Sequence, residues 1–156
     1  MIEIAKAVES HVEDIGKLWW EFYLFHHNVN PIFPLPDDPI PSFTKNHLRR
    51  FMTSEDCLVL VALDGTRVVG YGLLEKRRVP PEFKREPYGY IDQMAVTQEY
   101  RRGGVGEKLL AAIVEWFRSN GIRRLELGTA ATNEVGNSFW QKHGFKVYSH
   151  TLYKDT

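Results

Sequence analysis

The segment EYRRGGVGEKLLAAIVEWFRSNG, residues 99–121, constrains the fold of this 156-residue chain more than any other feature. Apolar side chains recur in it at the spacing of one helical face, and Asn120-Gly121 is typical of a helix end. Two arginines and three glycines stand at the start of the run, so the first helical turn carries little side-chain bulk. Such a terminus offers bare N–H groups and the positive end of a helix dipole, which together bind anions, most often phosphate. The segment therefore predicts an amphipathic helix that begins at a phosphate site.

The composition is that of an ordinary globular protein, with 43% apolar and 26% charged residues, so we expect residues 1–156 to form one domain. The formal net charge is zero, which argues against a nucleic-acid partner. No apolar run approaches the length of a membrane span, and the N-terminus is acidic where a signal peptide needs a basic start. Cys57 is the only cysteine, which excludes an internal disulfide and fits a reducing compartment. We therefore expect a cytoplasmic protein without a membrane partner.

Hydrophobic patterning and turn signals predict elements in the order β-α-α-β-β-β-α-β-α-β. They are a strand at residues 2–8, helices at 11–27 and 42–54, a hairpin at 57–78 that turns at Asp64-Gly65, a strand at 88–96, the helix described above, a strand at 123–130, a helix at 133–144 and a strand at 145–153. Five prolines within residues 28–41 predict a loop there. The helix–strand alternation of the C-terminal half predicts one parallel strand pair. The expected fold class is α/β (α+β), a mixed and mostly antiparallel sheet flanked by helices.

Two common phosphate-binding motifs are alternatives for the glycine run. The P-loop pattern G-x-x-x-x-G-K-[ST] fails, because GGVGEKLL lacks its second glycine and its hydroxyl residue at the required positions. The dinucleotide fingerprint G-x-G-x-x-G fits better, with Gly104, Gly106 and an acidic residue, Glu126, at roughly the required ~20 positions further on. Leu109 occupies the third glycine position, however, and the run follows a late strand rather than the first one. A dinucleotide-binding protein stays open as an alternative.

Two separated motifs resemble those of one enzyme family. R-R-G-G-V-G, residues 101–106, matches the [QR]-x-x-G-x-[GA] signature of the GNAT superfamily of N-acetyltransferases. N-E-V-G-N-S-F-W-Q-K-H-G-F, residues 133–145, approximates a second family element, N-x-x-A-x-x-x-Y-x-x-x-G-F. With the same element order, the resemblance extends over residues 2–155. It implies a GNAT-like sheet, acetyl-CoA as a co-substrate whose pyrophosphate occupies the predicted anion site, and transfer of the acetyl group to a primary amine.

The resemblance also implies which residues bind acetyl-CoA. In such proteins the strand before the phosphate loop carries a bulge that frees backbone groups for the pantetheine arm, and residues 94–96 are the matching positions. The phosphate loop supplies backbone N–H groups, and the second motif supplies two aromatic residues and an asparagine, which is also a typical helix cap. The implied cofactor-binding residues are Met94, Ala95, Val96, Arg101, Arg102, Gly103, Gly104, Val105, Gly106, Asn133, Phe139 and Trp140.

Asp92 is the implied catalytic base, because the family often has a carboxylate here that orients the amine or relays its proton through water. Asp92 precedes Met94 by two positions, so a regular strand places it on one face with Tyr90, Met94 and Val96. The alternative is a structural carboxylate that accepts hydrogen bonds from backbone groups or an arginine.

Trp140 is the second implied catalytic residue, since it stands where the family often has a tyrosine that protonates the leaving thiolate. An indole N–H can only donate a hydrogen bond, so this role needs direct departure of the thiolate or a substitute acid such as Tyr148 or Tyr153. The other interpretation of Trp140 is a core aromatic of a short helix.

The resembled family binds its cofactor with the C-terminal half of the chain, which leaves the N-terminal elements to bind the acceptor. The acceptor is therefore expected between the first helix, residues 28–41 and residues 79–87. Aromatic residues in WWEFYLFHH and PIFPLPDDP form either a pocket wall or core. Asp37, Asp38 and Asp92 favour a cationic amine, although the first two also fit a solvated turn.

No metal site is expected, because the neighbouring His26 and His27 diverge by about 100° on a helix. Cys57 is interpreted as a core thiol, which favours direct transfer in a ternary complex over a covalent enzyme intermediate. A homodimer is left open. An acyl-CoA-binding module without turnover is the alternative from another functional class.

Overall fold

A mixed β-sheet forms the centre of the computed structural model, which describes residues 1–30, 32 and 34–156. Within these residues the sheet order is β1-β2-β3-β4-β5, with β1 Ile2–Lys6, β2 Cys57–Asp64, β3 Arg67–Arg77, β4 Tyr88–Val96 and β5 Leu125–Glu126. Neighbouring strands are antiparallel except β4 and β5, which are parallel. This topology confirms the expected fold class and excludes the parallel sheet that a dinucleotide-binding domain requires.

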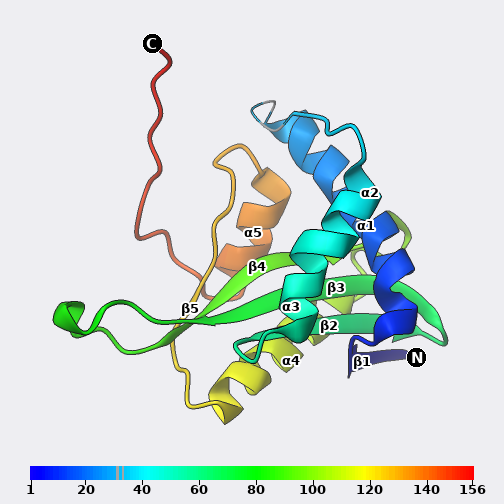
Figure 1. Cartoon of the computed structure of the whole chain (residues 1–156), viewed down its shortest axis with the longest axis horizontal. Coiled ribbons are helices and arrows are strands. Elements are labelled where there is room, and N and C mark those ends of the chain that lie inside the picture. Colours follow the sequence, from blue (N-terminus) through cyan, green and yellow to red (C-terminus); the bar gives the residue numbers. More distant parts are fainter. Residues whose placement is uncertain (31, 33) are drawn as a thin grey trace.

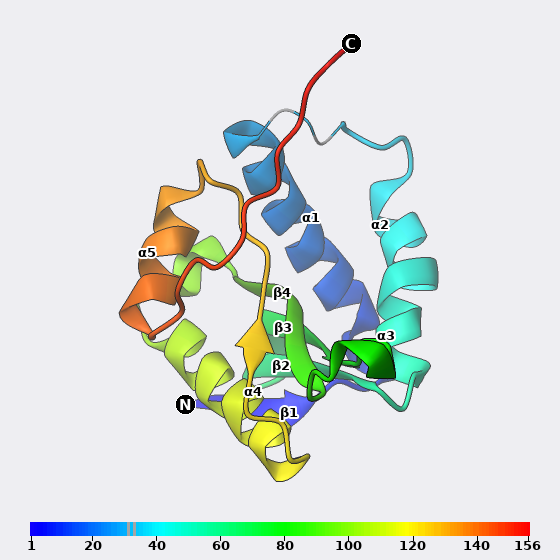
Figure 2. The ribbon, with the colours of Figure 1, turned by 90° about the vertical axis from the view of Figure 1, so that its left-hand side faces the viewer.

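Helices cover both faces of the sheet (Figures 1 and 2). One face carries α1 Val12–Val29, α2 Pro39–Ser42, a π-helical segment Phe43–Leu48 and α3 Arg49–Thr53. The other face carries α4 Val105–Ser119, and α5 Glu134–Lys142 packs beside the start of α4. The second expected helix thus begins at Pro39, three residues early, and is interrupted by a π-helical segment that its sequence pattern did not predict.

The core lies in two layers, one on each face of the sheet. In β2, Val59 and Val61 join the layer that contains Ile15 of α1. Alternate residues of the same strand, including Leu60, join the layer that contains Ile113 of α4. Full burial of one such aliphatic side chain contributes about 1.5–3 kcal/mol, so the continuous apolar run of the central strands is what fixes both helical layers onto the sheet.

The expected hairpin is confirmed, with Asp64 paired to Arg67 and Gly65 in the turn at a φ of 59°. The strand expected at residues 123–130 is shorter than predicted, because only Leu125–Glu126 pairs with β4. Pro31 and Phe33 of the expected proline-rich loop lie outside the described residues.

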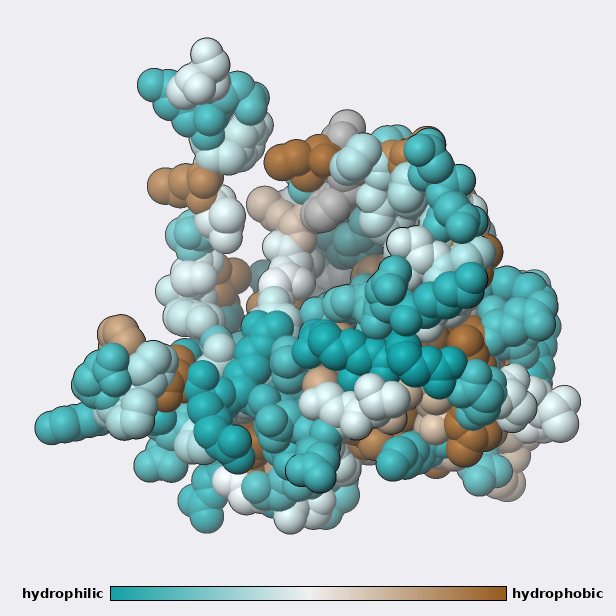
Figure 3. All heavy atoms as spheres, viewed as in Figure 1, coloured by the Kyte–Doolittle hydropathy of each residue, from teal (hydrophilic) through white to brown (hydrophobic). Residues whose placement is uncertain are grey.

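The strand expected at residues 145–153 is wrong for the described chain. These residues form no strand, and every residue from 146 to 156 is exposed. In Figures 1 and 3 the segment stands away from the body of the molecule and carries hydrophobic side chains along it. The alternation that suggested a strand is present, but no backbone among the described residues pairs with this segment, and an unpaired segment forms no ladder.

Gly89 fixes the place where β4, β5 and α4 meet. Its N–H donates to the Arg124 carbonyl at 2.8 Å, next to the Gly89–Leu125 pair of the ladder. A Cβ at this position would lie 2.7 Å from side-chain atoms of Leu125 and Phe117, and Phe117 is fully buried. The close approach of α4 to the β4–β5 junction therefore requires glycine at position 89.

We predict that Gly89→Ala lowers the free energy of unfolding by about 1–3 kcal/mol, the usual cost of overpacking a core. Urea unfolding of the two proteins measures the difference. Gly103→Ala is the matched control, because its Cβ would meet only the Tyr100 carbonyl at an ordinary 3.5 Å. An equal effect of the two substitutions would refute the packing role of Gly89.

Candidate functional site

β4 has an open edge where it separates from β5. The two strands pair only at Gly89 and Tyr90, and beyond these residues no described strand lies on this side of β4. The Thr97 N–H donates to the Val69 carbonyl at 2.9 Å, so the odd-numbered residues at the end of β4 bond to β3. Because ladder bonds alternate, the backbone groups of Met94 and Val96 point toward the open edge.

A β-bulge at Asp92 changes the faces of β4. Leu73 pairs with Gln93 and Leu74 with Ile91, so Asp92 is the extra residue. Asp92 and Gln93 consequently both point toward the α1–α3 layer, where they bond to His47 and Tyr71.

Two expectations for β4 are therefore corrected. The bulge lies at Asp92 and not at residues 94–96. Asp92 does not share a face with Met94 and Val96, which pack in the α4 layer, because the extra residue reverses the alternation. The alternation of side chains between the two faces of β4 is thus reversed after Asp92.

His47 is the polar partner of Asp92 that sequence reasoning missed. Its Nε2 lies 2.7 Å from Asp92 Oδ2, and the side chains are 39% and 20% exposed. Beneath them, the Tyr71 hydroxyl donates to Gln93 Oε1 at 2.8 Å. Burial first, and then the negative charge of Asp92, raise the pKa of Tyr71 well above its usual 10.0, so this hydroxyl stays neutral.

The start of α4 combines bare backbone N–H groups with two left-handed residues. Arg102 has a φ of 62° and Gly104, the N-cap, has a φ of 83°. No side chain caps this helix, and the first backbone bond is from Lys108 to the Gly104 carbonyl. The N–H groups of residues 105–107 therefore lack intrahelical acceptors. The Glu107 carboxylate accepts a hydrogen bond from its own backbone N–H in this turn, and this bond lowers the pKa of Glu107.

The two arginines before α4 have different surroundings. Arg101 Nε donates to the Val96 carbonyl at 3.0 Å, and its guanidinium lies 3.6 Å from Glu21 of α1. Arg102 is exposed and pairs with no carboxylate of the described chain. Arg101 therefore holds the loop against β4, while the charge of Arg102 is free for an anion.

Glu21 is a second residue that the sequence did not single out. It accepts hydrogen bonds from Thr97 Oγ1 at 2.9 Å and from the Gln98 N–H at 2.8 Å. With Arg101, these contacts join α1 to the loop between β4 and α4. A glutamate in the middle of an amphipathic helix gives no sequence signal of such a contact.

α5 borders the start of α4. Asn133 is buried, and its Oδ1 accepts from the Gly136 N–H at 3.0 Å, which is the helix-cap arrangement. A Cβ on Gly106 would lie 3.2 Å from the Phe139 ring, so glycine there also permits close packing of the two helices. Trp140 has its ring centroid 5.1 Å from Phe139, and its indole N–H makes no hydrogen bond to a described residue. Its observed contacts are those of a core aromatic.

The remaining candidate acids lie in the exposed C-terminal segment. The Tyr148 hydroxyl donates to Glu126 Oε1 at 2.6 Å, and Tyr153 is 81% exposed. Neither tyrosine ring is among the ring contacts of Trp140, which are with Phe139 and Phe145 in the described chain. Asp37 and Asp38 are exposed and form no ion pair with a described residue, as in a solvated turn.

The aromatic residues of α1 serve mainly as core. Trp19 is buried and stacks on Phe43 at 4.3 Å, while Trp20 and Tyr23 are partly buried and stack on each other at 5.8 Å. Among the described residues, no group of three histidine, cysteine or acidic side chains could hold a metal ion.

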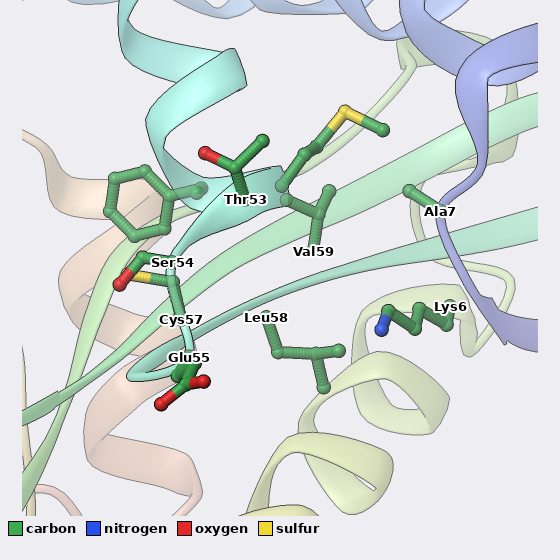
Figure 4. Close-up of a pocket in the computed structure, with 10 residues that line it drawn as sticks. Lys6, Ala7, Thr53, Ser54, Glu55, Cys57, Leu58 and Val59 are labelled. Atoms are coloured by element: carbon green, nitrogen blue, oxygen red, sulfur yellow. The ribbon is translucent and has the colours of Figure 1, made fainter.

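Cys57 lies in a separate pocket of about 230 Å³ between α3 and the start of β2 (Figure 4). Burial raises the pKa of its thiol, which lowers the fraction of reactive thiolate. The pocket contains no residue of β4 or α4. Cys57 and the open edge of β4 are thus separate features of the fold.

Several solved structures are similar to this chain over nearly its whole length. The chain is 19% identical over 99% of both chains to a mutant of the BH1408 protein from Bacillus halodurans, with a TM-score of 0.87. It is 18% identical to aminoglycoside antibiotic 6'-N-acetyltransferase AAC(6')-Ih from Acinetobacter baumannii, covering 100% of this chain and 98% of that one, with a TM-score of 0.77.

A third structure, aminoglycoside N-acetyltransferase AAC(6')-Iy in complex with CoA, is 17% identical, covers 100% of this chain and 95% of that one, and has a TM-score of 0.77. The TM-scores of these three structures establish a shared fold, and at these identities they establish the fold alone. A search of curated proteins found no match. None of the helices in the described residues has the length and apolar character needed to cross a membrane.

The model of one protein family, described as acetyltransferase (GNAT) family, matches residues 12–145. This match includes β2 to β5, the glycine loop and α5. The chain belongs to the acetyltransferase (GNAT) family.

Proposed function

We propose that the protein transfers the acetyl group of acetyl-CoA to a primary amine, directly, in a ternary complex. The observation that carries this proposal is the open edge of β4 leading to the uncapped start of α4, within a chain of this family. A structure similar in fold, that of AAC(6')-Iy, was solved with CoA and with a bisubstrate analogue of CoA, which supports the same donor here.

The proposal gives each part of the site one task. Within residues 94–96, the backbone groups of Met94 and Val96 at the open edge bind the amides of the pantetheine arm, as an added strand would, while Ala95 stays bonded to β3. The N–H groups of residues 102–106 and the Arg102 charge bind the pyrophosphate. Arg101 contributes by holding the loop. Asn133 holds the start of α5, and Phe139 and Trp140 border the cofactor as packing surfaces.

Departure of the coenzyme thiolate needs no acid from Trp140. A thiol with a pKa near ~8.5 is a tolerable leaving group, so the sulfur can depart as thiolate and take a proton from solvent. Cys57 lies in its own pocket with a raised thiol pKa, which supports direct transfer rather than an acyl-cysteine intermediate.

The acceptor is a small amine or an exposed peptide amine, held between α1, residues 28–41 and residues 79–87. Asp92 supplies negative charge on this side of β4, which favours a cationic amine over a neutral one. Several structures similar in fold are those of aminoglycoside acetyltransferases, which supports amine acceptors generally. A cytoplasmic location belongs to the same proposal, supported by a single, unpaired cysteine.

We also propose a homodimer formed through the C-terminal segment. Val147, Tyr148, Leu152 and Tyr153 are each more than 60% exposed on an extended backbone. β5 is the last strand of the described sheet, so its outer edge is open. Each chain thus carries both a strand-like segment and a free sheet edge. In a two-fold dimer, the segment of each chain pairs with the β5 edge of the other chain.

Binding of acetyl-CoA is predicted to raise the melting temperature by roughly 5–10 °C at a concentration about 100 times its dissociation constant. Gly104→Ala removes most of this shift, because a residue with a Cβ resists the φ of 83° that shapes the loop.

The matched control is Gly121→Ala at the other end of α4. Its φ is 74° and its surroundings are equally empty, so both variants lose similar stability without ligand. An acetyl-CoA shift that survives in Gly104→Ala as it does in Gly121→Ala would argue against the phosphate site. Stabilisation by NAD instead would indicate a different ligand.

Amine-dependent release of free thiol from acetyl-CoA is predicted with at least one class among polyamines, amino acids, aminosugars and lysine peptides. The rate rises from neutral to mildly alkaline pH, because an alkyl amine with a pKa near ~10.4 must lose its proton before attack. Binding of acetyl-CoA without release across the whole panel would support a binding module instead.

The homodimer is predicted to dissociate when Val147→Glu and Leu152→Glu are combined. Light scattering coupled to size-exclusion chromatography measures the mass of each protein. Phe83→Ser is the control, because Phe83 is 69% exposed in a different loop and its loss leaves the dimer intact. A monomeric wild-type chain at every concentration tested would contradict the proposed contact.

A further inference from the structure

His47 and Asp92 form a polar pair that neither sequence motif contains. His47 Nε2 lies 2.7 Å from Asp92 Oδ2, and both side chains are partly exposed. The two residues are 45 positions apart in the chain and meet on the α1–α3 side of β4. The pair stands where the strand edge opens, because β4 leaves β5 after Tyr90.

Two irregular backbone features bring the pair together. The π-helical segment Phe43–Leu48 contains His47, and the bulge in β4 turns Asp92 toward it. Single π-helical turns and bulges often occur at functional sites, where they redirect one side chain. The His47 ring is held between Phe43 and Phe51, with centroids at 5.9 and 5.1 Å. Its position is therefore set by packing as well as by the hydrogen bond.

The carboxylate decides which nitrogen of His47 carries the proton. An ionised carboxylate only accepts hydrogen bonds, so Nε2–H donates to Asp92 and the neutral ring has its lone pair on Nδ1. This arrangement of an acid, an oriented imidazole and a free ring nitrogen is that of a positioned general base.

None of the charged or titratable groups described below replaces His47 as the hydrogen-bond partner of Asp92. From β3, the Tyr71 hydroxyl faces Asp92 and is neutral. From α3, the Arg50 guanidinium also acts on Asp92, but it bonds to Glu75 of β3 at 2.9 Å. The contacts from α1 and the π-helical segment are aromatic, with Trp19 stacked on Phe43.

We propose that Nδ1 of His47 accepts the proton of the acceptor amine, and that Asp92 is a positioning residue acting through His47. This inference rests on the proposed acetyl transfer. The neutral amine nitrogen attacks the thioester carbonyl carbon, a C–N bond forms, and the C–S bond breaks with its electron pair on sulfur. The nitrogen proton passes to His47 Nδ1 and then to the thiolate or solvent, which leaves an amide and free coenzyme thiol.

The test compares His47→Gln, Asp92→Asn and the control His150→Gln, whose side chain is exposed in the C-terminal segment. Thiol release is measured against pH at saturating acetyl-CoA, and melting temperature with and without acetyl-CoA. We expect His47→Gln to lower kcat by about 10²–10⁴-fold, the usual contribution of a general base, with an unchanged acetyl-CoA shift. The rate of this variant then rises with pH only as the amine loses its proton. His150→Gln behaves as wild type.

Asp92→Asn gives a different signature. It lowers kcat less than His47→Gln does and leaves the acetyl-CoA shift unchanged, because the imidazole remains and loses only the partner that orients it. Added imidazole restores part of the activity of His47→Ala, which a purely structural histidine would not permit.

Two results separate failure of this inference from failure of the proposed function. Wild-type kcat and pH profile in His47→Gln, with normal acetyl-CoA binding, would overturn His47 as the base and leave acetyl transfer standing. A wild-type chain that neither binds acetyl-CoA nor releases thiol would overturn both.

Discussion

The short ladder between β4 and β5 is the constraint on which the rest of the structure depends. Two residue pairs hold the parallel strands together, and Gly89 allows Phe117 of α4 to pack directly over that junction. A longer ladder would satisfy the backbone groups of Met94 and Val96 within the protein. Because the ladder ends at Tyr90, those groups lie at an edge that a ligand with amide groups can complete.

One extra residue in β4 gives its two faces different side chains. Without the bulge, Asp92 would alternate with its neighbours as the sequence suggested, and its carboxylate would share the side of Met94 in the α4 layer. The insertion turns Asp92 toward α1–α3, while Met94 and Val96 stay with α4. The start of α4, where we propose the phosphate site, and the His47–Asp92 pair thus lie on different elements that β4 connects.

Much of the architecture could be predicted from the sequence, because it depends on local signals. The buried runs of β2 and β3, the Asp64-Gly65 turn and the glycine run before α4 each determine their own conformation through burial or positive φ. The site contacts that could not be predicted from the sequence are those between distant segments of the chain. His47 meets Asp92 only because a π-helical segment and a bulge coincide, and Glu21 meets residues 97 and 98 across more than 70 positions. The strand expected at 145–153 failed for the same reason, since an alternating pattern makes a strand only when another backbone pairs with it. The roles of Trp140 and Asn133 stay predictions beyond their observed packing and capping contacts.

An open edge inside a sheet is also a hazard for the chain that carries it. Unpaired N–H and C=O groups in a row are a template for any extended peptide, and natural sheets usually cover or charge such edges. Here the exposed row is only a few residues long, it begins beside the Asp92 carboxylate, and Arg101 already bonds to the Val96 carbonyl at its far end. The same features that would admit a narrow coenzyme arm therefore shorten the row of unpaired groups, and a short row is a weaker template for another strand than a long one.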